Sequence, residues 1–207
     1  MEDLWLTWAK RLQAIASTGM HYAKSPYDQE RYAEIASIAH EMLGALADVP
    51  PQRIHELVPE FAQGYATPLV EVRGAVFERD RILLVQEASD GLWTLPGGFA
   101  DVGKSPRENI VKEIWEEATI RVDATALYEV RHKAKHPYDP DTRDFYKLFF
   151  LCERLDDRTP KAGHETTATG YFAAGEIPPL SRGRTLEKDI EAAFAFRADP
   201  QRLCRFD

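Results

Sequence analysis

The chain has 207 residues, 44% hydrophobic and 29% charged, so disordered and fibrous proteins are poor interpretations. Its 26 Lys and Arg against 34 Asp and Glu give a net charge of −8, which disfavours a nucleic-acid partner for the chain as a whole. Two distant cysteines, Cys152 and Cys204, make no disulfide framework. The first twenty residues lack a signal peptide's apolar stretch, so we expect a cytoplasmic protein without a membrane partner.

The N-terminal residues carry the hydrophobic spacing of two helices. In the first helix, apolar residues recur at intervals of four, four and three and so form one apolar stripe: Leu4, Trp8, Leu12 and Ile15. Gly19 is expected to end this helix. Pro26 predicts the start of the second helix, and the Pro-containing segment 48–51 predicts its end. The second stripe has the same three-or-four spacing: Tyr32, Ile35, Ala39, Met42 and Leu46.

Two helices of this size cannot bury their stripes alone. A short helix over 54–62 and a linker over 64–68 are expected to follow them. We therefore predict a small helical domain over residues 1–66, with a dimerisation or substrate-capping role, and a larger domain over residues 67–207. The second stripe, with Trp5 and Trp8, favours a homodimer, although docking on the chain's own larger domain is the alternative.

After Pro68 the pattern changes to strands with few helices among them. The alternation and turn signals predict strands over residues 70–76, 82–85, 93–95, 121–135, 144–153 and 170–172. Helices are predicted over 106–118 and 186–196, the first capped by Ser105 with Glu108 three residues on. Strands mixed with only a few helices favour an α+β sandwich over a doubly wound sheet.

The predicted helix over 106–118 carries two distinct faces. At about 100° per residue, Glu113, Glu116 and Glu117 share one face. The apolar residues form another face that is expected to pack into the domain: Ile110, Val111, Ile114, Trp115 and Ala118.

The three carboxylates oppose their own helix. Near its C-terminal end the dipole favours cations, so each Glu costs about 0.3–1 kcal/mol. Like charges three and four residues apart also repel, and within the helix Lys112 alone offers a partner, to Glu116. A solvated acidic face is the plain alternative, but the arrangement indicates a bound cation, for which clustered oxygen ligands favour Mg²⁺, with Mn²⁺ as a substitute.

The segment that contains these carboxylates resembles the signature of a known family. Residues 97–120 read GGFADVGKSPRENIVKEIWEEATI. This is similar to the Nudix box, in which Gly, five residues, Glu and seven residues precede Arg-Glu-apolar-x-Glu-Glu-x-Gly-apolar. Laid from Gly98, the match runs through the following positions: Glu113, Ile114, Glu116, Glu117 and Ile120.

The resemblance implies a Nudix α/β/α sandwich with a mixed sheet, of class α+β. The N-terminal helices look like the extension of a bacterial subgroup described as ADP-ribose or CDP-choline pyrophosphatases. Residues 67–207 are then expected to form the Nudix hydrolase domain.

Three positions depart from the family pattern: Lys104, Lys112 and Thr119. In the family, Glu and Arg at the first two positions brace the loop against the helix. Two lysines cannot form that pair, so the brace is expected to be missing or rebuilt, by Asp101 with Lys104 or by Glu108 with Lys112. Thr119 replaces a glycine and, being β-branched, is expected to alter the helix exit.

The resemblance also implies an activity. Water attacks a phosphorus of a nucleoside diphosphate linked to another moiety, giving a nucleoside monophosphate and a phosphorylated partner, with Mg²⁺ as the cofactor. The implied metal ligands are the Gly98 carbonyl and the Glu113, Glu116 and Glu117 carboxylates. A loop glutamate serves as the general base in some relatives. Glu165 lies in the comparable position, and Glu116 or Glu117 could take the role instead.

The sequence identifies the residues that contact substrate less specifically than the metal ligands. The candidates are Arg73, His132, Lys133 and Tyr146, which could meet phosphates or stack on a base. A solvated strand edge and aromatic core packing are the competing interpretations. Two rival functions also stand beside the leading one. These are a Nudix enzyme that removes damaged nucleoside triphosphates, and a catalytically weak Nudix module that senses a nucleotide, which the substitutions at Lys104, Lys112 and Thr119 favour.

Overall fold

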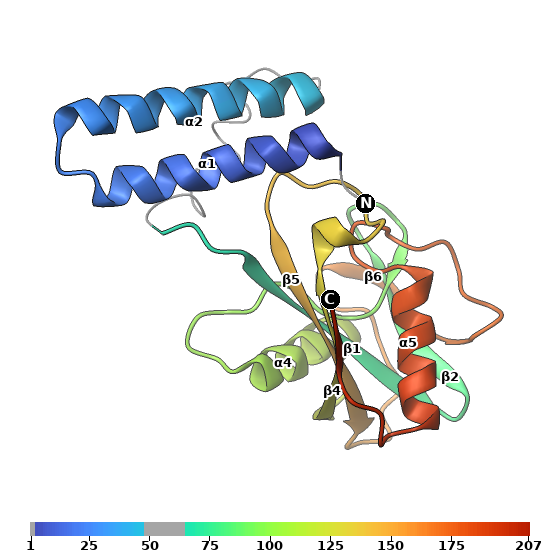
Figure 1. Cartoon of the computed structure of the whole chain (residues 1–207). Coiled ribbons are helices and arrows are strands. Elements are labelled where there is room, and N and C mark those ends of the chain that lie inside the picture. The colour runs from blue at the N-terminus through green and yellow to red at the C-terminus, as the bar shows by residue number, and fades with distance from the viewer. Residues whose placement is uncertain (1–2, 48–64) are drawn as a thin grey trace. The chain divides into compact units, whose positions relative to one another are not determined.

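The computed structural model describes residues 3–47 and 65–207, which fall into two compact units (Figure 1). One unit contains the described residues up to Leu69 together with residues 134–136 and 140–145. The other contains residues 70–133, 137–139 and 146–207. The domain boundary predicted between residues 66 and 67 stays a prediction. None of the helices in the described ranges is both long and apolar enough to cross a membrane.

The first unit is built on a helical hairpin. α1 (Leu4–Tyr22) is capped by Asp3, whose carboxylate accepts hydrogen bonds from the backbone N–H groups of Trp5 and Leu6. α2 (Pro26–Ala47) runs back beside α1 (Figure 1). The prediction that Gly19 ends the first helix is wrong. α1 continues through Gly19 to Tyr22, and the ring of Tyr32 occupies the space where a side chain at position 19 would stand. This glycine therefore allows α2 to pack closely against α1 and does not end the helix.

Several large apolar side chains of this unit remain exposed. Trp5 is 59% and Trp8 39% exposed, and their rings meet edge to face at 5.1 Å. The others are Leu4, Ile15, Met20, Tyr22, Tyr27, Ile38, Leu46 and Tyr65. The predicted helix end at 48–51, the short helix at 54–62 and the first linker residue lie outside the described residues.

The second unit is organised around a seven-stranded sheet. Its strands are β1 (Leu69–Glu78), β2 (Arg81–Glu87), β3 (Trp93–Thr94), β4 (Val122–His132), β5 (Phe145–Arg154), β6 (Thr166–Ala173) and β7 (Arg205–Phe206). The order is β3-β2-β1-β5-β4-β7, with β6 also paired to β2. β2 is antiparallel to β1, β3 and β6, and β4 to β5, whereas β4 and β7 are parallel, so the sheet is mixed as predicted.

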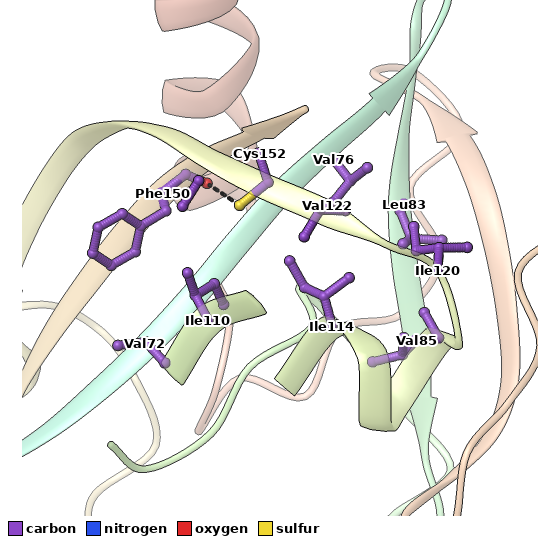
Figure 2. Packing of buried hydrophobic residues seen from close by; sticks show 12 residues of the cluster. Val72, Val76, Leu83, Val85, Ile110, Ile114, Ile120, Val122, Phe150 and Cys152 are labelled. Carbon is purple, nitrogen blue, oxygen red and sulfur yellow. Dashed lines mark hydrogen bonds between the residues drawn. The ribbon is translucent and has the colours of Figure 1, made fainter. Parts of the chain in front are cut away.

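α4 (Pro106–Ala118) and α5 (Glu187–Ala198) cover opposite faces of this sheet (Figure 1). Residues of β1 that point to opposite faces of the sheet belong to two separate cores. Val72 packs with Ile110 and Ile114 of α4 (Figure 2), whereas Ala75 packs on the side of α5. Burying a side chain the size of Ile114 contributes about 1.5–3 kcal/mol. The predicted α+β sandwich and its mixed sheet are confirmed.

The strand and helix predictions differ from the structure mainly at their ends. The strand predicted over residues 121–135 is shorter in the structure: β4 ends at His132 and is followed by a 3-10 turn, Lys133–Lys135. β6 starts four residues before its predicted beginning, at Thr166, because it pairs with β2 along its whole length. β7 has two residues and no sequence signal of its own.

Candidate active site

The helix that carries the three carboxylates is capped at its first turn as predicted. The Ser105 side chain accepts a hydrogen bond from the Glu108 N–H (3.2 Å), and the Glu108 carboxylate accepts one from the Ser105 N–H (2.7 Å). Such a cap is worth about 1 kcal/mol. Glu108 is therefore engaged at the N-terminal end of α4, and its expected pairing with Lys112 is replaced by other contacts of that lysine.

An open pocket of about 680 Å³ lies against the C-terminal half of α4. Its lining residues are Glu113, Trp115, Glu116, Glu117, Thr119, Ala162, Gly163, His164 and Glu165. The four carboxylates predicted to be catalytic thus line one pocket, although Glu165 follows Glu117 by 48 positions in the sequence. Their individual roles remain predictions.

The carboxylates differ strongly in environment. The Glu113 side chain is 12% and the Glu116 side chain 52% exposed, whereas Glu117 is buried. Burial raises the pKa of Glu117 to about 8, against the opposing effects of the Arg73 charge and a hydrogen bond from the Gly97 N–H at 2.8 Å. Burial also raises the pKa of Glu113. The positive charges of Lys112 beside Glu113 and of Arg73 near both groups therefore offset the effect of burial only in part.

The glycine turn before α4 is fitted closely around these groups. Gly97 has φ 143°, and a Cβ there would collide with the Val72 carbonyl. A Cβ on Gly98 would lie 2.8 Å from Glu113 Oε2, so the missing side chain leaves space beside that oxygen. The Gly98 carbonyl accepts a hydrogen bond from the Val72 N–H (2.9 Å). A carbonyl oxygen has two lone pairs, so the second is available for another partner.

Arg73, predicted to contact substrate, is buried and already engaged. It donates to Glu71 Oε1 at 2.7 Å, to the Leu95 carbonyl at 2.9 Å and to Thr94 Oγ1 at 3.3 Å. Its charge also lowers the pKa of Glu117 against the larger effect of burial. This geometry supports a role in positioning the strand that leads into the glycine turn, while its role in binding substrate stays a prediction.

Lys147 and Glu87 are charged groups that the sequence analysis did not single out. The buried Lys147 ammonium donates to Glu71 Oε2 at 2.6 Å, and burial lowers its pKa to about 8. Glu87 on β2 is buried and pairs with Arg184 at 3.2 Å; burial and the nearby Glu165 charge raise its pKa. Neither belongs to a local motif, because the sheet brings their partners from distant parts of the sequence.

The brace between loop and helix is rebuilt with different residues. Asp101 on the loop pairs with Lys104 at 2.8 Å, as one of the two expectations had it, and also with Lys112 of α4 at 3.3 Å. Lys112 further pairs with Glu116 at 2.9 Å and with Glu113 at 3.4 Å. A carboxylate from the loop and an ammonium from the helix therefore replace the family's Glu and Arg.

The exit of α4 is held by a distant loop. Thr119 adopts the left-handed conformation at φ 57°, at the position where the family has glycine, so the substitution leaves the turn in place. Such a conformation costs a non-glycine residue about 1–2 kcal/mol. The last carbonyls of the helix accept hydrogen bonds from the loop: Lys161 N–H to Ala118 at 3.0 Å, and Thr166 Oγ1 to Glu117 at 2.9 Å.

The same loop places Glu165 at the pocket. Gly163 lies so close to the helix that a Cβ would collide with the Glu116 carbonyl. Its N–H donates to Thr166 Oγ1 at 2.9 Å, and the Glu165 carbonyl accepts from the Ala88 N–H at 3.0 Å. Since the backbone on both sides is held, the exposed Glu165 side chain is presented from a fixed loop.

Trp115 was expected to pack into the domain, and that expectation is wrong. It is 41% exposed and lines the pocket, with the guanidinium groups of Arg158 and Arg121 lying 5.4 and 6.0 Å from its ring. Trp115 follows the buried Ile114 and is therefore turned about 100° around the helix from it, so its ring lies at the pocket rather than in the core.

The remaining substrate candidates do not line this pocket. The rings of His132 and Tyr146 meet at 5.7 Å, and the His132 N–H donates to Asp207 at 3.1 Å. Lys133 is buried in the 3-10 turn. The structure therefore brings His132 and Tyr146 together outside the lining of this pocket, and their contact with substrate stays a prediction.

The carboxylates fit a divalent cation in chemistry, although they are not preassembled. Among the described residues, no three His, Cys, Asp or Glu side chains are already gathered as a metal-holding group. Yet Glu113 and Glu117 have raised pKa values, and space beside Gly98 adjoins a Glu113 oxygen. Oxygen donors short of positive charge are what Mg²⁺ and Mn²⁺ favour, so these residues fit such a cation by their chemistry.

Comparison with known proteins places these features in a family. Residues 67–194 match the family described as the NUDIX domain, and residues 3–58 match one described as a UDP-X-like, N-terminal oligomerisation domain. A protein of Bacillus subtilis (strain 168), provisionally named ADP-ribose pyrophosphatase YjhB, is 38% identical over 207 residues, covering 100% of this chain and 99% of that protein.

Two solved structures resemble the chain. The crystal structure of a UDP-X diphosphatase has 32% sequence identity to this chain and a TM-score of 0.63, covering 98% of each chain. An ADP-ribose pyrophosphatase from Streptococcus suis has 37% identity and a TM-score of 0.62, covering 68% of this chain and 100% of that one. The predicted fold and the resemblance found in residues 97–120 are confirmed.

The raised pKa of Glu117 predicts a pH-dependent stability difference. The folded protein keeps the proton on Glu117 up to about pH 8, whereas an ordinary Glu releases it near 4.5. Glu117 therefore contributes less to stability as pH rises from about 5 to 8. Without divalent cations, Glu117→Gln, whose amide oxygen still accepts from Gly97, should gain melting temperature relative to wild type across that range. Glu191→Gln, an exposed change on α5, is the control, and a constant difference for Glu117→Gln would contradict the account.

Proposed function

The chain belongs to the Nudix hydrolase family, and on that premise we propose that it hydrolyses a nucleoside diphosphate linked to a second moiety. The products are a nucleoside monophosphate and the phosphorylated moiety. The observation that carries the proposal is the convergence of Glu113, Glu116, Glu117 and Glu165 on one open pocket. An open pocket suits a two-part substrate, because the pyrophosphate can lie at the carboxylates while both ends extend from them.

The names of the relatives narrow the substrate class. Two are described as ADP-ribose pyrophosphatases and one as a UDP-X diphosphatase, so the shared chemistry is a nucleoside diphosphate carrying a further group. ADP-ribose is the first substrate to test and CDP-choline the second. The residues proposed to contact the base or the phosphates are Arg73, His132, Lys133 and Tyr146.

Nudix hydrolases generally use divalent cations, and we assign Mg²⁺, with Mn²⁺ as a substitute. The residues that would hold the cation are Glu113, Glu116 and Glu117 with the Gly98 carbonyl. When bound, it neutralises charge on the phosphoryl oxygens and lowers the pKa of coordinated water.

The chain's own groups supply orientation and proton transfer. Glu117 is held in place by the Gly97 N–H, and Arg73 stabilises its charge. The Glu165 carboxylate is exposed at the pocket on a loop fixed at both sides, so it serves as the base that takes a proton from the attacking water. Glu116, also exposed at the pocket, is the alternative base.

The N-terminal unit is proposed to join two chains. Its exposed apolar residues include Trp5 and Trp8, and an exposed apolar patch of this kind commonly marks an interaction site. The match of residues 3–58 to an oligomerisation domain supports a homodimer. We retain residues 1–66 as this domain, with a dimerisation or substrate-capping role, and residues 67–207 as the hydrolase domain. The two unpaired cysteines support a cytoplasmic location.

Activity assays test the catalytic assignment. ADP-ribose, CDP-choline, UDP-glucose and 8-oxo-dGTP are compared with and without Mg²⁺ or Mn²⁺. Metal-dependent cleavage of a nucleoside diphosphate derivative is expected, and Glu113→Gln or Glu117→Gln should lower kcat/KM about a hundredfold or more, since metal-mediated charge stabilisation is worth several kcal/mol. Glu165→Gln should lower kcat by about 10²-fold or more while Mn²⁺ binding is retained.

Glu191→Gln on the exposed face of α5 is the matched control and should retain full activity. Preferred cleavage of 8-oxo-dGTP would favour the triphosphate-cleaning function instead. Absence of turnover, with ADP-ribose still raising the melting temperature, would favour the sensing module.

Sedimentation tests the homodimer. Wild type should have the mass of two 23.5 kDa chains, and the double variant Trp5→Lys, Trp8→Lys should shift toward one, because charge on the apolar face opposes its burial. Leu203→Lys, at a side chain 87% exposed in the other unit, should leave the dimer intact. A monomeric wild type would contradict the proposal, as would a double variant that remains dimeric.

A further inference from the structure

The ammonium group of Lys112 lies among three carboxylates at the edge of the proposed metal site. Its Nζ is 2.9 Å from Glu116 Oε2, 3.3 Å from Asp101 Oδ2 and 3.4 Å from Glu113 Oε1. The Lys112 side chain is 32% exposed, so water screens these contacts only in part. Two of the three partners are residues proposed to hold the divalent cation.

We propose that Lys112 is an internal counter-cation that occupies the place between Glu113 and Glu116 and excludes a divalent cation from that pair. The inference rests on the proposed function and narrows its ligand set: in wild type the cation is held by Glu113, Glu117 and the Gly98 carbonyl, while Glu116 stays paired with Lys112. It concerns how many cations the site binds and how tightly. Lys112 then neutralises the Glu113 and Glu116 carboxylates in the way that a metal ion would otherwise do.

The two oxygens of Glu113 show how the site is divided. Oε1 faces Lys112, whereas Oε2 lies beside the space left by Gly98, 2.8 Å from the position of a Cβ. A cation held by Glu117 and the Gly98 carbonyl can therefore use Oε2 and leave the lysine in place. A cation between Glu113 and Glu116 has to displace the ammonium group or sit beside it against Coulomb repulsion.

The local charge balance supports the same conclusion. Asp101, Glu113 and Glu116 are matched by Lys112 and Lys104, which leaves one negative charge in the cluster. Loss of the Lys112 charge leaves two, and two carboxylates without a counter-ion attract a divalent cation. Lys104 separates this effect from net charge, because within the described residues it pairs with Asp101 but forms no ion pair with Glu113 or Glu116.

Metal titration of the full-length apo protein tests the inference without substrate. Free Mn²⁺ is measured by electron paramagnetic resonance during titration of wild type, Lys112→Met and Lys104→Met. Lys112→Met should bind Mn²⁺ at least tenfold more tightly or bind one additional ion per chain, whereas Lys104→Met should change the affinity less than threefold. Lys112→Arg, which keeps the charge, should resemble wild type.

A further variant locates the gained site. Adding Glu116→Gln to Lys112→Met should return binding toward the wild-type curve, because it removes one carboxylate of the pair. Unchanged or weaker binding by Lys112→Met would overturn the proposal and leave the lysine as a brace between loop and helix. If Lys112→Met does not fold, as judged by circular dichroism, Lys112→Gln is titrated with the same expectations.

Wild-type binding separates this inference from the proposed function. Mn²⁺ binding by wild type that is lost in Glu117→Gln supports the proposed metal site whatever Lys112→Met does. If wild type and Glu117→Gln bind equally, the proposed site fails, and a gain in Lys112→Met that depends on Glu116 still supports the counter-cation.

Discussion

Three carboxylates crowd the last turns of α4, where the helix dipole is also negative, and much of the surrounding structure compensates for that charge. Lys112 lies against the exposed side of the cluster, whereas Arg73 and the Gly97 N–H stabilise the buried carboxylate of Glu117. The compensation is incomplete, because burial still raises the pKa of Glu117 to about 8. A site that remains short of positive charge is prepared to bind a cation, and this links the helix to the proposed chemistry.

The cost of this arrangement is met by contacts from distant parts of the chain. Arg73 is itself buried, and it is held by Glu71, which Lys147 also neutralises. Removing one partner from such a buried set costs about 3–5 kcal/mol, since an unpaired charge is left behind. The carbonyls at the end of α4 likewise depend on the loop that carries Glu165, so closing the helix and positioning the proposed base are one structural event. This coupling places a loop acid beside a helix acid without either being near the other in sequence.

Local signals in the sequence predicted the elements well. The capping box at Ser105, the shared face of Glu113, Glu116 and Glu117, and the strand predicted over residues 70–76 depend on neighbouring residues alone, and the structure confirms each of them. Helices cover both faces of the sheet, so β1 is buried on both sides and its exposure does not alternate. Signals that depend on tertiary contact failed. Gly19 continues its helix because Tyr32 packs there, Trp115 stays at the surface, and Thr119 accepts a strained turn that a distant loop supports. Sequence spacing could not decide which of the two expected ion pairs would brace the loop against the helix. The structure shows Asp101 paired with Lys104 and, in addition, with Lys112. The roles of the site residues stay predictions, because geometry places them together without showing the reaction.

The position of a bound metal ion tests the central claim most directly. Crystals of the full chain grown with Mn²⁺ can be measured at the manganese absorption edge, where anomalous scattering locates the ion independently of the protein phases. The account predicts an anomalous peak coordinated by Glu117, Glu113 and the Gly98 carbonyl, on the side of Glu113 that faces away from Lys112. A saturating Mn²⁺ concentration that places no ion at these carboxylates, or places it only elsewhere on the surface, would contradict the account.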